Sequence, residues 1–255
     1  MRAIITGASS GIGSEIAREL SRRGYAVALL ARRAELLEAL ARELPTAVAV
    51  ACDVTDRASV HAAVRRAEAE LGGPFDLAVA NAGVSIPNHA AKFSVDDAEL
   101  VLRVNVFGML YLYDAVIPGM IERRAGRFVG VASMAGLRAI PSAGPYSASK
   151  AAMQAFLEAS RIELAPYGVG VTTVNPGFVS TPMTEKNRFR MPFLMTATRA
   201  ARIIVDGIER GRRVVQFPRR MSLLMRTIRV LPDAIYDRGM KRYGQRKMDS
   251  GKVKR

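Results

Sequence analysis

The chain has a single cysteine, Cys52, and only two histidines, His61 and His89. One cysteine excludes an intrachain disulfide framework and a cysteine-based zinc cluster, and two histidines argue against a histidine-rich metal site. With 21 glycines and 12 prolines in 255 residues, the chain also lacks the composition of a collagen-like repeat or a low-complexity segment. Hydrophobic residues at 49% and charged residues at 24% are ordinary for a globular protein, so we expect a folded chain without a metal.

A secretory signal and a membrane-spanning stretch are also missing from the sequence. Only the short apolar run Ala3-Ile4-Ile5 precedes Thr6-Gly7, which is too short for a signal core. The longest uncharged stretch, residues 164–184, contains three prolines and three glycines and is therefore unsuited to a membrane helix. With one thiol and no targeting segment, we expect a cytoplasmic protein, and only its C-terminal part leaves membrane association open.

The excess positive charge of the chain is confined to its C-terminal part. Residues 1–185 hold 18 basic and 18 acidic residues, whereas residues 186–255 hold 20 basic and 5 acidic ones, which accounts for the whole net charge of +15. Such an asymmetry predicts an anionic partner, either nucleic acid or a membrane surface. Because the basic residues are not interleaved with aromatic ones and match no nucleic-acid motif, nucleic acid is the less expected of the two.

Short apolar runs alternate with longer segments of helical period along the chain. The expected strands are Ala3–Thr6, Ala26–Ala31, Ala47–Cys52, Leu77–Ala80, Phe128–Ala132, Val169–Val174 and Arg213–Phe217. The expected helices are Gly13–Arg23, Ala34–Glu43, Ala58–Leu71, Asp96–Arg123, Ser149–Ala165 and Thr198–Glu209. Uniformly apolar strands that alternate with helices are typical of parallel sheets covered on both faces. We therefore predict an α/β fold with a single Rossmann-type, doubly wound domain over residues 1–218, its seven-stranded sheet mostly parallel, followed by a basic amphipathic extension over residues 219–255.

A glycine-rich segment, Thr6-Gly-Ala-Ser-Ser-Gly-Ile-Gly13, lies between the first expected strand and the first expected helix. Glycines at such a junction let the backbone turn tightly and approach a pyrophosphate, which the free N–H groups of the helix N-terminus then bind. The alternative is a turn that only caps the helix. The position at the first strand-to-helix junction favours a dinucleotide site.

Several ordered motifs together identify a family. The glycine segment has the spacing G-x-x-x-G-x-G and is followed by Asp53-Val54, Asn81-Ala82-Gly83, Asn105, Ser133, Tyr146-Ser-Ala-Ser-Lys150 and Pro176-Gly177. Because they carry these motifs in this order, residues 1–217 closely resemble the short-chain dehydrogenase/reductase family of the classical type. The resemblance implies an NAD(P)-dependent oxidoreductase that transfers a hydride between nicotinamide and a carbonyl or secondary alcohol.

The second expected strand ends in Ala31-Arg32-Arg33, where an enzyme that uses NAD would carry a carboxylate for the ribose hydroxyls. A guanidinium donates two hydrogen bonds to a 2′-phosphate, so the sequence favours NADP (NADPH) over NAD. The alternative is a solvated arginine pair that opens a helix. The resemblance implies that Asp53 bonds the adenine, that Asn81 and its neighbours hold the ribose, and that Gly177 and its neighbours border the nicotinamide. The cofactor-binding set implied in this way is Gly7, Ser9, Ser10, Gly11, Ile12, Gly13, Arg32, Arg33, Asp53, Val54, Asn81, Ala82, Gly83, Tyr146, Lys150, Pro176, Gly177, Val179 and Thr181.

The candidate catalytic residues are Asn105, Ser133, Tyr146 and Lys150. Tyr146 and Lys150 are four residues apart near a helix start and so project from one face. A phenol has an ordinary pKa of about 10, and we expect the Lys150 ammonium and an oxidised nicotinamide to lower it so that Tyr146 exchanges a proton with the substrate. Ser133 would orient the substrate oxygen, and Asn105 would hold a water that links Lys150 to solvent.

The segment Pro182–Thr198 is a long connection that contains Met183, Phe189, Met191, Phe193, Leu194 and Met195. In the resembled family this segment closes over the substrate, so its apolar side chains predict a hydrophobic, lipid-like or steroid-like carbonyl compound or alcohol. Methionine and phenylalanine also fill ordinary protein cores, which is the alternative explanation.

Beyond the last expected strand, residues 219–231 form a basic amphipathic pattern that Pro232 ends. Its apolar face would carry Met221, Leu224, Met225, Ile228 and Leu231, and its polar face Arg219, Ser222, Arg226 and Arg229. This pattern suits an anionic membrane surface, and the alternative is a cover for the substrate pocket or a subunit contact. The terminal Lys241–Arg255 stretch, with seven basic residues and one acid, is expected to be mobile.

Two functions remain open from the sequence. The first is an NADP-dependent oxidoreductase acting on a small-molecule carbonyl or alcohol, which the resemblance implies is a homodimer or homotetramer built through its fourth and fifth helices. The alternative is a non-catalytic dinucleotide-binding sensor or scaffold whose basic tail binds a partner. The presence of both Tyr146 and Lys150 favours the enzyme.

Overall fold

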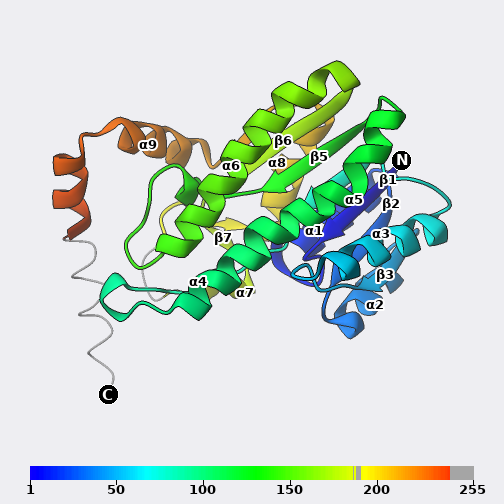
Figure 1. Cartoon of the computed structure of the whole chain (residues 1–255), viewed down its shortest axis with the longest axis horizontal. Helices are drawn as coiled ribbons and strands as arrows, with labels where there is room; N and C mark the ends of the chain where they lie inside the picture. The colour runs from blue at the N-terminus through cyan, green and yellow to red at the C-terminus, as the bar shows by residue number, and fades with distance from the viewer. Residues whose placement is uncertain (186, 188–190, 242–255) are drawn as a thin grey trace.

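The computed structural model describes residues 1–185, 187 and 191–241. Its main sheet has seven strands, β1 (Arg2–Thr6), β2 (Ala26–Ala31), β3 (Ala47–Ala51), β4 (Leu77–Ala80), β5 (Gly126–Val131), β6 (Val169–Pro176) and β9 (Val214–Phe217). The strand order is β3-β2-β1-β4-β5-β6-β9, and every neighbouring pair is parallel (Figure 1). The predicted doubly wound sheet is confirmed, and the described sheet is parallel throughout. The order reverses between β1 and β4, and ligands of such sheets bind at the carboxyl ends of the strands at this point.

Helices cover both faces of the sheet. One face carries α1 (Gly11–Arg22), α2 (Ala34–Arg42) and α8 (Ala197–Glu209), and the other carries α3 (Arg57–Leu71), α5 (Gly108–Glu122) and α6 (Gly144–Leu164). In β1, Ala3 and Ile5 pack into the first layer and Ile4 into the second, and all three are fully buried. Burial on both sides explains why the strands are apolar at every position rather than at alternate ones.

The long helix predicted over Asp96–Arg123 is in fact three segments. α4 (Val95–Leu102) leads into a π-helical turn, η2 (Arg103–Phe107), and then into α5. Within the described residues, this 95–122 stretch alone is long and apolar enough to cross a membrane, with a mean hydropathy of 1.6. Leu112 and Met120 from it are fully buried against the sheet, as in the core helix of a globular domain.

Two further predictions of helix and loop need correction. α6 begins at Gly144 rather than Ser149, so Tyr146 and Lys150 both lie in its first two turns. The segment predicted as a plain connection, Pro182–Thr198, contains the short helix α7 (Pro182–Glu185) and the strand β8 (Met195–Thr196), which pairs in parallel with β7 (Val179–Ser180). Phe189 of this segment lies outside the described residues. The described residues also form three single 3₁₀ turns: η1 (Ala90–Lys92), η3 (Met134–Gly136) and η4 (Ala165–Tyr167).

The C-terminal part projects from one end of the molecule as α9 (Arg219–Val230) and a second helical stretch over residues 233–241 (Figure 1). The predicted faces of α9 were partly wrong. Ser222, expected on the polar face, is 8% exposed and donates a hydrogen bond to the Pro218 carbonyl oxygen at 3.1 Å. Leu224, expected on the apolar face, is 47% exposed. The expectation of a mobile terminus concerns Lys241–Arg255, of which Lys241 is the last residue of the helical stretch and residues 242–255 lie outside the described part of the chain.

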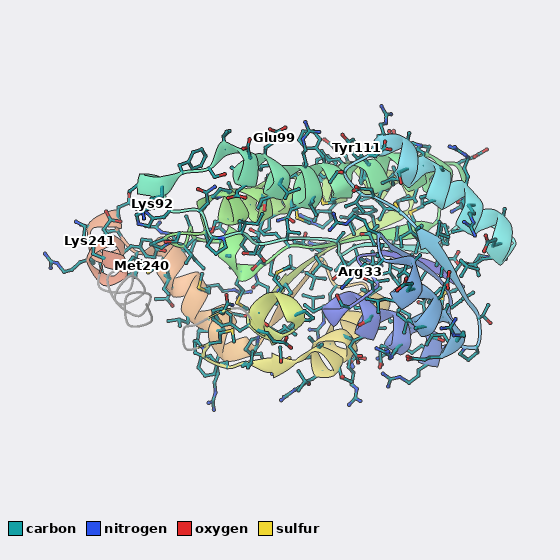
Figure 2. All side chains as sticks on the ribbon, turned by 90° about the horizontal axis from the view of Figure 1, so that it is seen from below. Arg33, Lys92, Glu99, Tyr111, Met240 and Lys241 are labelled. Atoms are coloured by element: carbon teal, nitrogen blue, oxygen red, sulfur yellow. The ribbon has the colours of Figure 1, made fainter. Side chains whose placement is uncertain are left out.

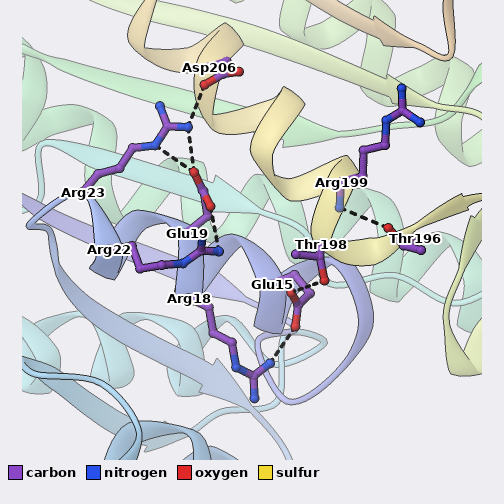
Figure 3. A network of polar contacts seen from close by, with 9 residues as sticks. All are labelled: Glu15, Arg18, Glu19, Arg22, Arg23, Thr196, Thr198, Arg199 and Asp206. Carbon is purple, nitrogen blue, oxygen red and sulfur yellow. Dashed lines mark hydrogen bonds and ion pairs between the residues drawn. The ribbon is translucent and has the colours of Figure 1, made fainter.

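A network of ion pairs joins α1 to α8 (Figure 3). The Glu19 carboxylate is almost buried and contacts Arg22 and Arg23, each at 2.7 Å. Arg23 also contacts Asp206 of α8 at 2.6 Å, and the Thr198 hydroxyl at the start of α8 donates to Glu15 at 2.7 Å. The helix that starts at the glycine turn is therefore fixed to the helix that follows β8.

Candidate active site

The glycine turn between β1 and α1 is shaped by close approaches that only glycine allows. Gly7 and Gly11 have φ angles of +68° and +63°, in the region that favours glycine. A Cβ atom on Gly13 would lie 2.3 Å from the Gly7 carbonyl oxygen and 2.4 Å from the Asn81 amide nitrogen. The first turn of α1 thus packs directly against the loop, and the unpaired N–H groups of a helix N-terminus are the groups that bind a pyrophosphate.

Asn81, at the carboxyl end of β4, ties this loop to the neighbouring strand. Its side-chain amide donates to the carbonyl oxygens of Thr6 and Gly7 at 3.1 and 3.2 Å. In return, the Thr6 hydroxyl accepts from the N–H groups of Asn81 and Ala82. The ends of β1 and β4, between which the strand order reverses, are therefore held in a fixed position relative to each other.

Arg33 lies at the end of β2 and reaches across to the glycine turn (labelled in Figure 2). Its guanidinium donates to the hydroxyl of Ser9 at 2.8 Å and to that of Ser10 at 3.0 Å. Three groups that bind phosphate oxygens well are thus gathered at the adenosine end of the site.

Asp53 follows β3 and is the acidic residue of this region. Its carboxylate accepts from the Thr55 N–H at 2.9 Å and from the Thr55 hydroxyl at 2.8 Å. The backbone hydrogen bond from Thr55 is the main reason that the pKa of Asp53 is below its ordinary value, and the charge of Arg32 adds to the effect. Asp53 is therefore an ionised acceptor at neutral pH.

A cleft of about 600 Å³ runs along the carboxyl edge of the sheet. It is lined by all but one of the residues predicted to bind the cofactor, including Gly7 of the glycine turn, Arg33 after β2, and Tyr146 and Lys150 of α6. The exception is Gly13, which shapes the turn from behind. The cleft, the glycine turn and the exposed helix N-terminus fit a dinucleotide in its extended form.

Sequence reasoning missed part of the lining. The cleft wall also includes Ala31, Val84, Ser85, Ile86, Val104, Val131, Ala132, Pro182 and Thr184. Most of these are ordinary apolar residues, which carry no motif that would distinguish them from core residues. Ala31, Val131 and Ala132 lie at the ends of expected strands and could have been indicated by that position, whereas Val104 lies within an expected helix and gives no such signal.

Ser133, Tyr146 and Lys150 line the opposite end of the cleft from Arg33. Ser133 follows β5 and its hydroxyl accepts from the Ala135 N–H at 3.1 Å, while its carbonyl oxygen accepts from Gln154 of α6 at 2.7 Å. The Lys150 ammonium donates to the Val131 carbonyl oxygen at 2.8 Å, and its nitrogen lies 5.8 Å from the centre of the Tyr146 ring. The strand β5 and the helix α6 together set the spacing of the three side chains.

Burial shifts the titration of both ionisable groups. The pKa of the Tyr146 phenol is raised by desolvation, which outweighs the opposing effect of its hydrogen bond with Ser133. Desolvation likewise lowers the pKa of the Lys150 ammonium from 10.5 to about 7. The expected lowering of the Tyr146 pKa is thus not produced by the groups of the chain alone, because a lysine that is half charged at neutrality is a weak stabiliser of phenolate.

Asn105, predicted to hold a catalytic water, lies in the π-helical turn η2 and is fully buried. Its amide oxygen accepts from the Val84 N–H at 2.8 Å, and its amide nitrogen donates to the Val84 carbonyl oxygen at 3.0 Å and to the Ser149 hydroxyl at 2.9 Å. Ser149 in turn donates to the Tyr146 carbonyl oxygen at 2.7 Å. Asn105 does not line the cleft, and it joins the loop after β4 to the helix of Tyr146 and Lys150.

Comparison with known proteins agrees with this geometry. The family model described as short chain dehydrogenase matches residues 1–191. An uncharacterized oxidoreductase from Myxococcus xanthus is 39% identical over 94% of this chain and 96% of its own length. A glycine betaine reductase from Emericella nidulans is 42% identical over 71% of this chain, a match that covers only 14% of that much longer protein.

Two solved structures are also similar. A short-chain dehydrogenase/reductase from Burkholderia phymatum in complex with NAD superimposes with a TM-score of 0.81 at 26% identity, covering 88% of this chain and 91% of the other. A 3-ketoacyl-(acyl-carrier-protein) reductase from Brucella melitensis complexed with NADH gives 0.79 at 28% identity, covering 84% and 95%.

Proposed function

Because the chain belongs to the short-chain dehydrogenase/reductase family and is therefore an oxidoreductase with a nicotinamide cofactor, we propose that it reduces a carbonyl compound, or oxidises the corresponding secondary alcohol, with NADP(H). The observation that carries this proposal is the single cleft that joins the glycine turn to Ser133, Tyr146 and Lys150. When bound, the nicotinamide cofactor supplies or accepts the hydride.

Tyr146 is the proposed proton donor and acceptor. Because its pKa is above the ordinary value, the phenol is protonated at neutral pH and can donate to the oxygen of a carbonyl that is being reduced. The Ser133 hydroxyl, hydrogen-bonded to Tyr146, would hold the same oxygen in place. Lys150, buried beside the tyrosine ring, would orient the nicotinamide ribose and favour phenolate when it is charged.

The cluster of Arg33, Ser9 and Ser10 supports NADP rather than NAD. A 2′-phosphate is a dianionic acceptor that a guanidinium and two hydroxyls would bind together. The corresponding chain segment, Ala31-Arg32-Arg33, carries no carboxylate to repel that phosphate. The two solved structures contain NAD and NADH, so the preference proposed here is a property of this chain's own residues.

The proposed substrate is hydrophobic. The cleft wall includes Val84, Ile86, Val104 and Met183, and apolar lining selects apolar ligands. Phe193 and Leu194, in the segment between α7 and β8, are 44% and 49% exposed and add apolar surface.

We also propose a cytoplasmic homodimer or homotetramer. Exposed apolar side chains on α4, η2 and α6 support association through these helices: Leu100, Leu102, Phe107 and Ile162. Light scattering of the purified chain would measure the mass directly, and a monomer at all concentrations would contradict the proposal.

The test of the proposed reaction is a panel of carbonyl compounds and alcohols of graded hydrophobicity, followed by NADPH absorbance. Tyr146→Phe should lower kcat by at least about 100-fold while NADPH binding stays unchanged, because only the transferable proton is removed. Full activity of this variant would show that Tyr146 has another role. If the unaltered chain binds NADPH but turns over no member of the panel, the proposed class of substrate is wrong.

A further inference from the structure

The C-terminal helix α9 uses one side to attach to the domain. Met225 and Ser222 are buried on this side, and the Met221 sulfur would lie 3.1 Å from a Cβ atom placed on Gly177, a residue of the cleft wall. Residues 233–241 attach as well, because Asp233 pairs with Arg138 at 2.6 Å and the Tyr236 hydroxyl donates to the Ala139 carbonyl oxygen. The extension is thus held against the substrate end of the domain.

The outward side of α9 carries apolar residues at its centre. Leu223 is 69% exposed and Val230 is 78% exposed. Residues seven apart differ by only about 20° around a helix, so these two side chains lie in one line along it. Arg219 and Arg226, also seven apart and exposed, flank this line on one side, and Arg220 flanks it on the other. We call Leu223, Val230 and these three arginines the outer face of α9.

The arginines of the outer face differ from those of α1 in their pairing. Arg18, Arg22 and Arg23 of α1 all contact carboxylates (Figure 3). Over residues 1–185, 187 and 191–241, by contrast, none of the three arginines of the outer face has a carboxylate partner. Residues 219–232 contain no acid at all, and the sequence beyond residue 241 adds six basic residues and one acid. The positive charge of this end is therefore available to an external partner.

We infer that the outer face of α9 docks on an anionic phospholipid bilayer, with Leu223 and Val230 inserted among the acyl chains and the three arginines at the lipid phosphates. A helix that lies in the bilayer interface needs this arrangement of a narrow apolar line with cations on both sides, which extend their charged ends to the headgroups. A soluble acidic partner would account for the arginines but would leave the two most exposed apolar side chains of the helix without a function.

Docking in this way also brings the substrate end of the cleft near the bilayer. Met221 on the inner side of α9 adjoins Gly177, so roughly one helix diameter, about 10 Å, separates the cleft wall from the lipid surface. An apolar carbonyl substrate dissolved in the membrane would then reach the site without crossing water. This consequence rests on the proposed function, whereas the docking itself does not.

The absence of tryptophan from the chain gives a direct test with the full-length protein. Leu223→Trp introduces a single fluorophore on the outer face, and Leu36→Trp introduces one at a 44% exposed position of α2 as a control. With vesicles of phosphatidylcholine and phosphatidylglycerol, the emission of the first variant should shift to the blue and be quenched by brominated acyl chains, whereas the control should not change. Equal behaviour of the two variants would overturn the inference, including the case in which the protein binds the vesicles through another segment.

Two further variants test the inference. One separates the contribution of the arginine charges from that of side-chain insertion, and the other distinguishes docking on lipid from association with a second copy of the chain. R219Q/R220Q/R226Q should lower the partition coefficient on these vesicles at least about tenfold relative to the control R42Q/R65Q, since each cation near an anionic surface contributes. An equal loss in both variants would contradict specific docking.

Without vesicles, L223E/V230E should leave the mass in light scattering unchanged, and a changed mass would assign the outer face to a second copy of the chain and refute the inference. None of these readouts requires turnover, so failure of the proposed reaction is detected separately.

Discussion

The Lys150 ammonium nitrogen lies 5.8 Å from the centre of the Tyr146 ring and is anchored 2.8 Å from the Val131 carbonyl oxygen at the end of β5. The lysine is 3% exposed, and its burial lowers its pKa to about 7. A buried cation is poorly solvated and destabilises the fold. The charged form of Lys150 beside the Tyr146 phenol therefore lowers the stability of the protein.

The burial of Lys150 predicts that the free energy of unfolding depends on pH, and that substitution of Lys150 removes this dependence. The pKa of Lys150 is 10.5 in the unfolded chain and about 7 in the folded one, so between these values the unfolded chain binds more protons and stability rises with pH. Below about pH 7 the lysine is charged in both states and its destabilising effect is complete. Lys150→Met should therefore be more stable than the unaltered protein near pH 7, with a difference that shrinks by at most about 1.4 kcal/mol per pH unit as pH rises. Urea unfolding across this range measures it, and a constant difference would show that Lys150 is charged in the folded state throughout.

The contact of Arg33 with Ser9 and Ser10 predicts how cofactor preference changes. Arg33→Ala should weaken NADPH binding about 10- to 100-fold, because charge-assisted hydrogen bonds to the 2′-phosphate are lost, and should leave NADH binding almost unchanged. Equilibrium fluorescence titration with both dinucleotides measures the ratio. Arg42→Ala, on the exposed end of α2, is the matched control, and an equal loss for both dinucleotides would place Arg33 elsewhere than at the 2′-phosphate.

The tight packing behind the glycine turn predicts that a single methyl group disrupts it. In Gly13→Ala the new Cβ atom would meet the Gly7 carbonyl oxygen at 2.3 Å, so the turn must move away from its binding geometry. Dinucleotide affinity should fall at least tenfold, which corresponds to about 1.4 kcal/mol. Gly239→Ala provides the comparison, since nothing lies within 4 Å of its added Cβ. Normal affinity of the Gly13 variant would mean that the turn tolerates displacement.

The ion pairs of α1 predict different stability effects according to burial. Glu19 is 7% exposed in its side chain and contacts two arginines, so Glu19→Ala should cost about 2 kcal/mol through the loss of two charge-assisted hydrogen bonds, while Arg23 keeps its contact with Asp206. Glu70→Ala removes the partner of Arg66 in a pair whose side chains are 40% and 62% exposed, and should cost at most about 1 kcal/mol. Thermal unfolding of the two variants gives the comparison, and similar losses would show that the α1–α8 network is effectively solvated.

The sequence predicted the strands and the position of the cleft well because both depend on local signals. An apolar run of six residues such as Ala26–Ala31 is short for a helix and fits a buried strand, and the glycine segment supplies residues that can adopt the positive φ angles of a tight turn. The π-helical turn at Arg103–Phe107 could not be predicted, because one inserted residue per turn leaves the apolar pattern nearly continuous.

Two other errors arose from tertiary structure. Contacts with Pro218 and Gly177 determine which side of α9 is buried. As a result, the polar Ser222 is buried and the apolar Leu224 is exposed, the opposite of what their hydropathy predicts. The pKa of Tyr146, which we expect Lys150 and an oxidised nicotinamide to lower together, is raised in the chain itself through desolvation by residues distant in sequence. Neither the buried side of a helix nor the pKa of a buried group can be predicted from the local sequence pattern.

The bond from Lys150 to Val131 and the bond from Gln154 to the Ser133 carbonyl oxygen connect the end of β5 to α6 without using the chain between them. Residues 137–143, which span that interval, can therefore change while the proton-transfer groups keep their separation, except at Arg138 and Ala139, which hold the C-terminal extension. The distance between the proton-transfer groups is thus fixed by bonds between a strand and a helix rather than by the length of the loop that joins them.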